Sequence, residues 1–482
     1  MSIQSNKSTS ASEALGEFVA GLKWSDVDPS LQAKVKAHVL DTLGVMCAGV
    51  GTAESVAVEA AVRRWGGIEE ATVIATGLRL PAPHAAFLNT FHGRIHTFDD
   101  THETGPLHPG SAVVSAALAA AEAKIALGGT NAAPSGTDGN GVSGADFLTA
   151  VLAGYEVSVR ISAALGPAHY AAGFHNTGTC NTFGACVAAA RIFGLDGTAT
   201  AEALGLAGEA AAGLRQYQVD GSMSDSALNA ARAAQAGVSS VEFQRAGLSG
   251  PKGILDGEWG VCRVMSSQPD LARLTRGLGS TYDFSSTAIK PYPSCRFTHG
   301  PIAVLLALRR RHGFDSSDVA TVEIATFRES ISVSDQPLIR ARLDAILSHQ
   351  YNAALALTDG RIALDSFDPE RIADPALLAL AKRVRVVFDP AFDRAYPAKW
   401  PHRVSVTLKD GHRFEADSDH PPGGAESPLT WDEVVEKFTS LAVPRLGDDA
   451  AQHVVALVAN LEACADIAQL IRELYGLAAR AN

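Results

Sequence analysis

The hydrophobic pattern of the chain changes twice, and these changes limit the folds that the sequence can adopt. From about Glu13 to Leu274, apolar residues recur at helical spacing in Ala-rich segments such as SLQAKVKAHVLDTLGVMCAGV. From about Tyr282 to Asp417 apolar and polar residues alternate, as in ATVEIATF, RVRVVFDP and RVSVTLKDGHRFEAD. The first pattern predicts helices and the second predicts half-buried strands. The helical pattern then returns and continues to the end of the chain.

This order predicts a mainly α protein with an inserted α/β domain. We expect residues 1–281 and 418–482 to form one all-helical domain, and residues 282–417 to form an α+β lid domain. A chain of 482 residues is too long for one ordinary hydrophobic core, which also favours two bodies. A cleft between two such bodies is a common place for a small-molecule site.

Two local signals support this division. The dipeptide Asp410-Gly411 between alternating segments is typical of a β-hairpin turn. Thr430 and Glu433 have the spacing of a capping box, which predicts that the helical pattern resumes there with WDEVVEKFTSLA.

Composition excludes several functional classes. The chain is 46% hydrophobic and 19% charged with a net charge of −12, and its longest basic run is Arg309–Arg311, so we expect no nucleic-acid partner. The start, MSIQSNKSTSAS, lacks the order of a signal peptide, and no run of eighteen apolar residues predicts a membrane span. Six scattered cysteines without CxxC spacing indicate reduced thiols. We therefore expect a cytoplasmic protein with no membrane partner.

One segment, HGRIHTFDDTHETGPLHPG, concentrates ionisable side chains in a way that packing does not require. It holds four of the 15 histidines of the chain within 19 residues. Its ionisable candidates are His92, His96, Asp99, Asp100, His102 and His108. Imidazoles and carboxylates move protons near neutral pH or bind metals, so the chemistry is expected here.

Two further segments share the design of a polar loop that runs into a helix. His175 precedes the helix of NTGTCNTFGACVAAARIF, and Lys290, Cys295, Arg296 and His299 precede or begin the helix of HGPIAVLLAL. The first segment likewise runs into a helix after its last histidine. Free N–H groups at a helix N-terminus bind anions. Three such starts facing one cleft would suit a di- or tricarboxylate.

Less specific interpretations stay open. A single histidine of this kind is more often a capped or half-buried side chain than a catalyst. His92 and His96 could bind a metal with Asp99 or Asp100, although the spacing matches no recognised zinc motif. The acidic pair could also be a helix cap beside a solvated acid. We expect no metal there. No GxGxxG or GxxxxGK[ST] motif occurs, so neither dinucleotide nor P-loop chemistry is expected.

HTFDDTHETGPLHPGSAVVSAALAAAEA, GFHNTGTCNTFGACVAAARIFGL and KPYPSCRFTHGPIAVLLAL resemble the three signature blocks of the MmgE/PrpD family. That family includes 2-methylcitrate dehydratase, cis-aconitate decarboxylase and iminodisuccinate epimerase. The resemblance covers nearly the whole chain. It implies a helical domain with an α/β lid, a homodimer, no cofactor and a small polycarboxylate substrate.

The resemblance also implies roles for particular residues. The positions that match family active sites are Asp100, Thr101, His108, His175 and Lys290. We expect catalytic roles for His108, His175, Lys290, Asp99 and Asp100. We expect substrate contacts from Thr97, Thr101, His102, Cys295, Arg296 and His299.

The chain departs from the family pattern at three places. Thr97 stands where many members have Asp, and Cys295 stands where the decarboxylases have His. The loop GSMSDSALNAARAAQAG lacks the lysine of a TKRLH-like family motif, and Ser224–Ser226 occupy that neighbourhood. The missing Asp and the missing lysine together suggest a substrate that differs in charge or size from methylcitrate or aconitate.

The sequence therefore predicts a cofactor-independent lyase, most simply a dehydratase, that removes a proton next to a carboxylate of a small di- or tricarboxylic acid. An epimerase or decarboxylase of a related acid is the near alternative. A non-catalytic relative that binds a carboxylate ligand is the alternative from another class.

Overall fold

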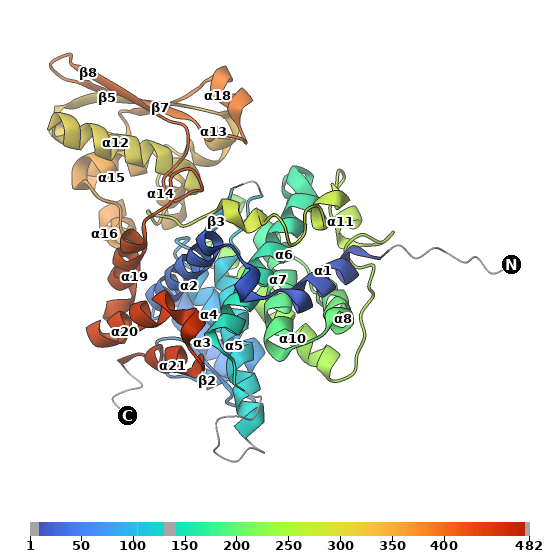
Figure 1. Cartoon of the computed structure of the whole chain (residues 1–482). Helices are drawn as coiled ribbons and strands as arrows, with labels where there is room; N and C mark the ends of the chain where they lie inside the picture. Colours follow the sequence, from blue (N-terminus) through green and yellow to red (C-terminus); the bar gives the residue numbers. More distant parts are fainter. Residues whose placement is uncertain (1–8, 104, 130–140, 478–482) are drawn as a thin grey trace.

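Two hydrophobic cores divide the molecule into two bodies. The computed structural model describes residues 9–103, 105–129 and 141–477. The larger core combines apolar side chains from Ala11 to Ile289 with others from Val434 to Leu474. The smaller core takes its side chains from Ile302 to Leu408. Figure 1 shows the smaller body, gold and orange, above the larger helical body. The prediction of a mainly α protein with two domains is confirmed.

The larger body is built from helices of both ends of the chain. Its helices are α1 (Ala11–Gly21), α2 (Pro29–Gly49), α3 (Ala53–Arg63), α4 (Ala82–Arg94), α5 (Gly110–Gly129), α6 (Gly144–Ala171), α7 (Asn176–Phe193), α8 (Gly197–Gly208), α10 (Met223–Arg245), α11 (Val261–Val264), α19 (Trp431–Leu446), α20 (Asp448–Ala459) and α21 (Ala468–Glu473).

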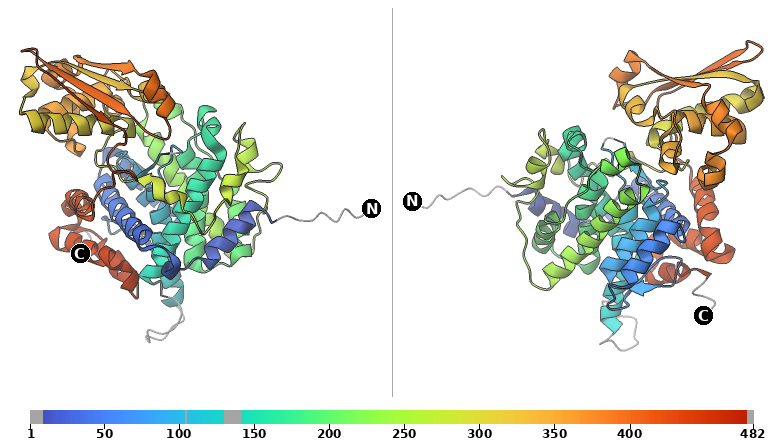
Figure 2. Two further views of the ribbon diagram at one scale, coloured as in Figure 1. Left: turned by 45° about the horizontal axis from the view of Figure 1, so that its top comes forward. Right: turned by 180° about the vertical axis from the view of Figure 1, so that it is seen from behind.

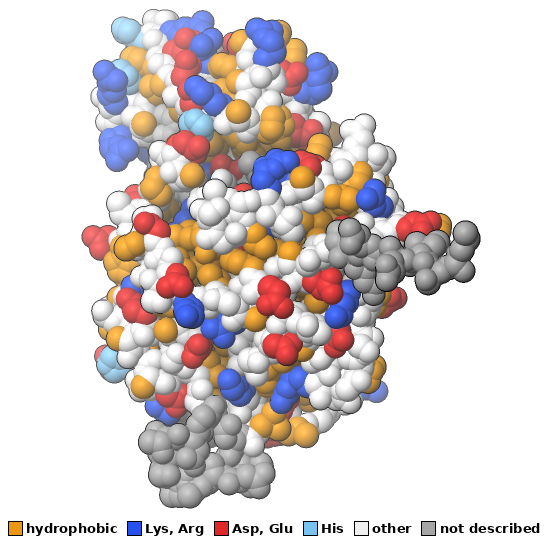
Figure 3. All heavy atoms as spheres, turned by 45° about the vertical axis from the view of Figure 1, so that its right-hand side comes forward, with side chains coloured by type: hydrophobic (Ala, Val, Ile, Leu, Met, Phe, Trp, Pro, Cys, Tyr) orange, Lys and Arg blue, Asp and Glu red, His pale blue; other side chains and the backbone are white. Residues whose placement is uncertain are grey.

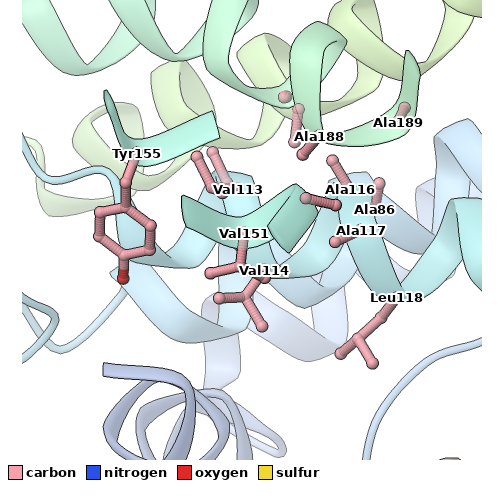
Figure 4. Close-up of a cluster of buried hydrophobic side chains, with 14 of the residues drawn as sticks. Ala86, Val113, Val114, Ala116, Ala117, Leu118, Val151, Tyr155, Ala188 and Ala189 are labelled. Carbon is pink, nitrogen blue, oxygen red and sulfur yellow. The ribbon is translucent and has the colours of Figure 1, made fainter. Parts of the chain in front are cut away.

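Helix α7 lies at the centre of this body and packs on α5, α6 and α10. Small side chains allow these close approaches: Ala188 and Ala189 of α7 face Ala116 and Ala117 of α5 in the cluster of Figure 4. A Cβ on Gly184 would collide with the Ser158 hydroxyl of α6. The Ala-rich composition of these segments is therefore explained by helix packing.

Two of the described helices have the length and composition of a membrane span. They are Gly110–Leu127 of α5 and Gly144–Ala171 of α6, and the bent pair α2 and α3 passes as one unit. Of the apolar windows of α5 and α6, 72% and 94% are buried inside the protein. Their apolar character thus coincides with burial in the larger core.

The C-terminal helices pack on the N-terminal part of the larger body. Helix α19 lies against α2, as the two views of Figure 2 also show. The predicted capping box is confirmed: the Glu433 N–H donates to Thr430 Oγ1 (3.3 Å) and the Thr430 N–H donates to Glu433 Oε2 (2.7 Å). Farther along α19, Lys437 Nζ lies 2.6 Å from Asp41 Oδ1 of α2, and this ion pair is buried.

The smaller body is a four-stranded sheet covered by helices. The strands are β5 (Val319–Thr326), β6 (Val384–Phe388), β7 (His402–Leu408) and β8 (Arg413–Ser418) in the order β6-β5-β7-β8. β5 and β6 are parallel, and the other pairs are antiparallel. The lid helices are α12 (His299–His312), α13 (Arg328–Ser334), α14 (Arg342–Leu347), α15 (His349–Asp359), α16 (Pro369–Ile372), α17 (Pro375–Ala381) and α18 (Pro390–Ala395). The turn predicted at Asp410-Gly411 joins β7 to β8, with Gly411 at a φ of 92°.

A short ribbon holds the beginning of the lid segment on the larger body. β3 (Thr101–His102) pairs with β4 (Thr287–Ala288), although 185 residues separate His102 from Thr287. Ile289, next along the chain, belongs to the larger core. The chain therefore passes from one core to the other after Ile289, and Lys290 lies at the junction of the two bodies.

The surface carries mixed charge on the face seen in Figure 3, where acidic and basic side chains are interspersed over both bodies. This distribution agrees with the absence of long basic runs in the sequence.

Candidate active site

A cavity of about 610 Å³ lies at the junction of the two bodies. Eight of the eleven residues expected in the site line it: Thr97, Thr101, His102, His108, His175, Lys290, Cys295 and Arg296. The three signature segments thus contribute to one cavity, as the sequence led us to expect.

His108 faces the cavity with a defined tautomer. Its Nδ1 lies 2.7 Å from the Asp100 carbonyl oxygen, which can only accept, so Nδ1 carries the proton. The neutral ring therefore has its unprotonated Nε2 available as a base. Burial lowers the pKa of His108 well below its usual value, and the positive charges of Arg94 and Lys290 lower it further. His108 is accordingly neutral at pH 7 in the free protein.

Lys290 is a buried cation with a neutral partner. Its Nζ donates to the Thr97 carbonyl oxygen (2.7 Å), and the residue is 1% exposed. Burial lowers its pKa to about 7; Asp99 opposes this shift and Arg94 adds to it. Thr97 has a φ of 56°, in the left-handed region that a β-branched residue rarely adopts. The lysine is therefore held at a strained backbone position of the cavity wall.

His175 is the N-cap residue of α7, and its Nε2 lies 3.2 Å from the Tyr217 hydroxyl. Tyr217, which also lines the cavity, lies on α9 (Gln216–Asp220). Burial lowers the pKa of His175 to about 3, so this ring is also neutral at pH 7. An imidazole and a phenol thus form a hydrogen-bonded pair on the cavity wall.

Asp99 and Asp100 lie behind the cavity wall. Asp99 Oδ1 accepts from Arg94 Nη1 (3.0 Å) and lies 3.8 Å from His108 Nδ1. Asp100 Oδ2 accepts from Tyr155 (2.6 Å) and from His38 Nδ1 (2.9 Å). The carboxylate that contacts a histidine at hydrogen-bonding distance is therefore Asp100, but the histidine is buried outside the cavity.

The first N–H group of α5 already has a hydrogen-bond partner within the protein. Asp100 Oδ1 accepts from the Gly110 N–H (2.9 Å), which begins this helix. The expectation that this helix start offers free N–H groups to a ligand is wrong at Gly110, because the expected acid acts as its cap.

Arg296 and His299 have internal partners. Arg296 donates through Nε and Nη2 to Glu103 Oε1 (2.9 and 2.6 Å) and through Nη1 to the Pro422 carbonyl. His299 is fully buried, lies behind the cavity wall and has Nε2 3.3 Å from the Ser294 carbonyl. Arg296 thus brings a neutralised charge to the cavity, and His299 supports the wall.

Two cations of the cavity were missed in the sequence. Arg94 ends α4, and Arg215 precedes α9; both line the cavity. The Arg215 guanidinium lies 3.2 Å from the centre of the Tyr170 ring and donates to the Tyr170 carbonyl and to Gln218 Oε1. Its position just before the serine-rich segment was the available signal. That segment, expected to be a loop, is helix α10 from Met223 onward, and Ser226 in the first turn of this helix lines the cavity.

The described residues do not support the metal site that the sequence left open at His92 and His96. Among the residues that the structure describes, no group of three or more His, Cys, Asp or Glu side chains could hold a metal ion. His96 Nε2 lies 3.1 Å from the Ala48 carbonyl, and its Nδ1 lies 3.1 Å from Arg342. Asp99 is paired with Arg94 instead of with either histidine.

The six cysteines are free thiols, as predicted. Cys295 is half-buried on the cavity wall, where its N–H donates to the Ile346 carbonyl of the lid (3.0 Å).

The fold and the cavity together define a class: two-domain, mainly helical enzymes whose ionisable side chains gather at the domain junction. Within that class, the chain belongs to the MmgE/PrpD family. The model of the MmgE/PrpD N-terminal domain matches residues 13–274, and that of the C-terminal domain matches residues 292–463. Membership and the named relatives make the chain a lyase-type enzyme.

The chain is similar, over nearly its whole length, to proteins named as cis-aconitate decarboxylases or decarboxylase-like. The cis-aconitate decarboxylase-like protein oryM of Aspergillus oryzae is 26% identical, covering 96% of each chain. Cis-aconitate decarboxylase of Mus musculus is 27% identical, covering 97% of this chain and 94% of its own. That of Aspergillus terreus is 24% identical, covering 98% and 97%.

Proposed function

We propose that this chain is a cofactor-independent lyase that transfers protons on the carbon next to a carboxylate of a small tricarboxylic acid. One observation carries the proposal. His108 has Nδ1 bonded to the Asp100 carbonyl, while its basic Nε2 has no hydrogen-bond partner among the described residues, on a cavity that also holds Lys290 and Arg215.

In the proposed mechanism His108 Nε2 removes the α-proton. A neutral imidazole is needed for this step, and the lowered pKa of His108 supplies it at pH 7. A bound polycarboxylate adds negative charge to the cavity, which raises the pKa of the ring and strengthens it as a base.

Lys290 and Arg215 bind the carboxylates and stabilise the charge that develops as the proton leaves. The hydrogen bonds of both side chains go to neutral oxygens of the described chain. Their positive charges are therefore available to a ligand, in a buried setting where they act strongly.

The His175–Tyr217 pair supplies the second proton transfer. In a dehydration, the electron pair of the broken C–H bond forms the double bond, and the β-hydroxyl leaves as water with a proton from this pair. Tyr217, held by His175 Nε2 at 3.2 Å, gives this proton. After the product leaves, the phenolate takes a proton from water and His108 releases the abstracted proton to water.

Decarboxylation is the second candidate, and the names of the relatives favour it. There carbon dioxide leaves with breakage of the C–C bond, and the carbanion takes a proton from the same groups. Cys295 stands where the family's decarboxylases have His, which favours dehydration for this chain.

The proposal is tested by incubating the protein in heavy water with hydroxy tricarboxylates and with cis-aconitate. Proton NMR follows exchange at the α-carbon, ultraviolet absorbance follows the new conjugated double bond, and released carbon dioxide identifies decarboxylation. We expect exchange with at least one acid, and a loss of about a hundredfold or more in His108→Ala.

His453→Ala is the matched control, since this histidine side chain is 67% exposed and does not line the cavity. It should keep full activity. Tight binding of acids without exchange would instead identify a carboxylate-binding protein and contradict the proposed function.

A further inference from the structure

The two bodies line the cavity with opposite chemistry. The larger body contributes its histidines together with Arg94, Arg215 and the adjoining Lys290. The lid side contributes chiefly apolar side chains. The members used in this argument are Phe297, Val333, Leu343, Ile346, Leu347 and Trp400. A tricarboxylate without an apolar group offers nothing to this second wall.

The apolar wall is ordered by its own packing. The Phe297 and Trp400 rings stack with centres 4.8 Å apart and an interplanar angle of 24°. Tyr396, beside them, stacks on the buried Phe327 at 4.4 Å and 15°. Ile346 is fully buried in the lid core, and Leu343 on the same helix α14 is 7% exposed. These side chains form a preformed surface.

An acidic lid residue on the wall strengthens the asymmetry, and the basic lid residue there, Arg296, is paired with Glu103. Glu329 of α13 lines the cavity, and its carboxylate repels an anionic group placed on the lid side. The carboxylates of a ligand are therefore directed toward Lys290 and Arg215.

The cavity volume also favours a ligand larger than a six-carbon acid. A cavity of about 610 Å³ falls within the range of roughly 300–1,000 Å³ that accommodates drug-sized ligands. A six-carbon acid held by the cationic wall would leave the apolar wall in contact with water, which is unfavourable.

We infer that the natural substrate is a polycarboxylic acid with an apolar alkyl or aryl substituent longer than methyl, which lies on the lid wall. This inference rests on the proposed function, because it extends the substrate of that same site. The carboxylates take the cationic wall, and the substituent covers Val333, Leu347 and Trp400.

Binding and turnover test the inference separately. Isothermal titration calorimetry compares succinate with its ethyl, butyl and hexyl derivatives. Each methylene that is buried should increase the affinity about three- to fourfold, with an increasingly negative heat-capacity change. In the same order, kcat/KM for alkyl-substituted hydroxy tricarboxylates should rise.

Val333→Phe places a larger side chain on the apolar wall and should reduce the preference for hexylsuccinate over succinate about tenfold or more. Leu338→Phe is the matched control: Leu338 is 71% exposed and outside the cavity lining, so the preference should be unchanged. Thermal unfolding of both variants checks that each is folded.

Equal affinity for succinate and all its alkyl derivatives overturns the inference, even if the enzyme turns over an unsubstituted acid. Failure of every acid to exchange its α-proton removes the proposed function instead. A chain-length dependence that Val333→Phe does not change would also overturn the inference, because the chain would then lie elsewhere.

Discussion

Lys290 shows how one residue acquires its chemistry from its surroundings. On an exposed surface the ammonium would be protonated throughout the physiological range. Burial beside Arg94 brings its pKa to about 7, although the Asp99 carboxylate opposes the change. The same side chain is therefore a cation below neutral pH and a neutral amine above it, so carboxylate binding becomes dependent on pH.

We predict that kcat/KM falls as the pH rises through about 7, by about tenfold per unit, since the free enzyme then loses the Lys290 cation. Lys290→Arg should remove this basic limb from the pH profile, because arginine stays protonated. Lys34→Arg is the control: burial lowers the pKa of Lys34 to about 8, but Lys34 does not line the cavity. The same basic limb in Lys290→Arg would contradict the assignment.

Asp100, between α4 and α5, connects several parts of the larger body. Its carbonyl oxygen accepts from His108, and its carboxylate accepts from Tyr155, His38 and the first N–H of α5. Asp100 thus joins three buried donors to His108, which lines the cavity. We assign it a positioning role, because its side chain does not reach the cavity.

Asp100→Asn should lower the free energy of unfolding by about 1.5–3 kcal/mol, since a buried carboxylate that accepts three hydrogen bonds is replaced by an amide. Because His108 is held by the backbone there, kcat should fall more than KM rises. Denaturant unfolding and steady-state kinetics measure the two effects.

Asp146→Asn is the control for this substitution. Asp146 lies in the first turn of α6 with a side chain that is 54% exposed, so its change should stay within about 0.5 kcal/mol. A fully active and fully stable Asp100→Asn protein would refute the positioning role.

At the scale of the whole molecule, the two ends of the chain are tied together on the larger body. The buried pair of Lys437 and Asp41 links α19 to α2, and Lys437 also donates to the Phe98 carbonyl (3.0 Å), next to Asp99 in the chain. A second, more exposed pair joins Lys36 to Glu462 at 2.9 Å. The homodimer expected from the family resemblance stays a prediction.

Lys437→Met should lower the free energy of unfolding by about 3–5 kcal/mol, because Asp41 is left buried without its cation. Adding Asp41→Leu should restore much of the stability, since the pair is then replaced by apolar side chains. Lys36→Met should cost about 1 kcal/mol or less, as is typical of exposed pairs. Urea unfolding of the four proteins decides; equal costs for Lys437→Met and Lys36→Met would contradict the buried link.

Local sequence determined the elements of this protein. The strands β5 to β8, the Asp410-Gly411 turn and the helix start at Thr430 follow from alternation, turn chemistry and capping, which depend on neighbouring residues. The side chains suited to proton transfer were also identifiable, because few residue types titrate near neutral pH.

Tertiary structure decided which of these side chains share a cavity and with what charge. The β3–β4 ribbon brings Lys290 to the first segment, burial changes its pKa, and Asp100 is drawn away to cap α5. Arg215 enters the site from a loop with no motif. These outcomes depend on contacts between residues far apart in the chain and on the loss of water around them, and neither is encoded in local spacing.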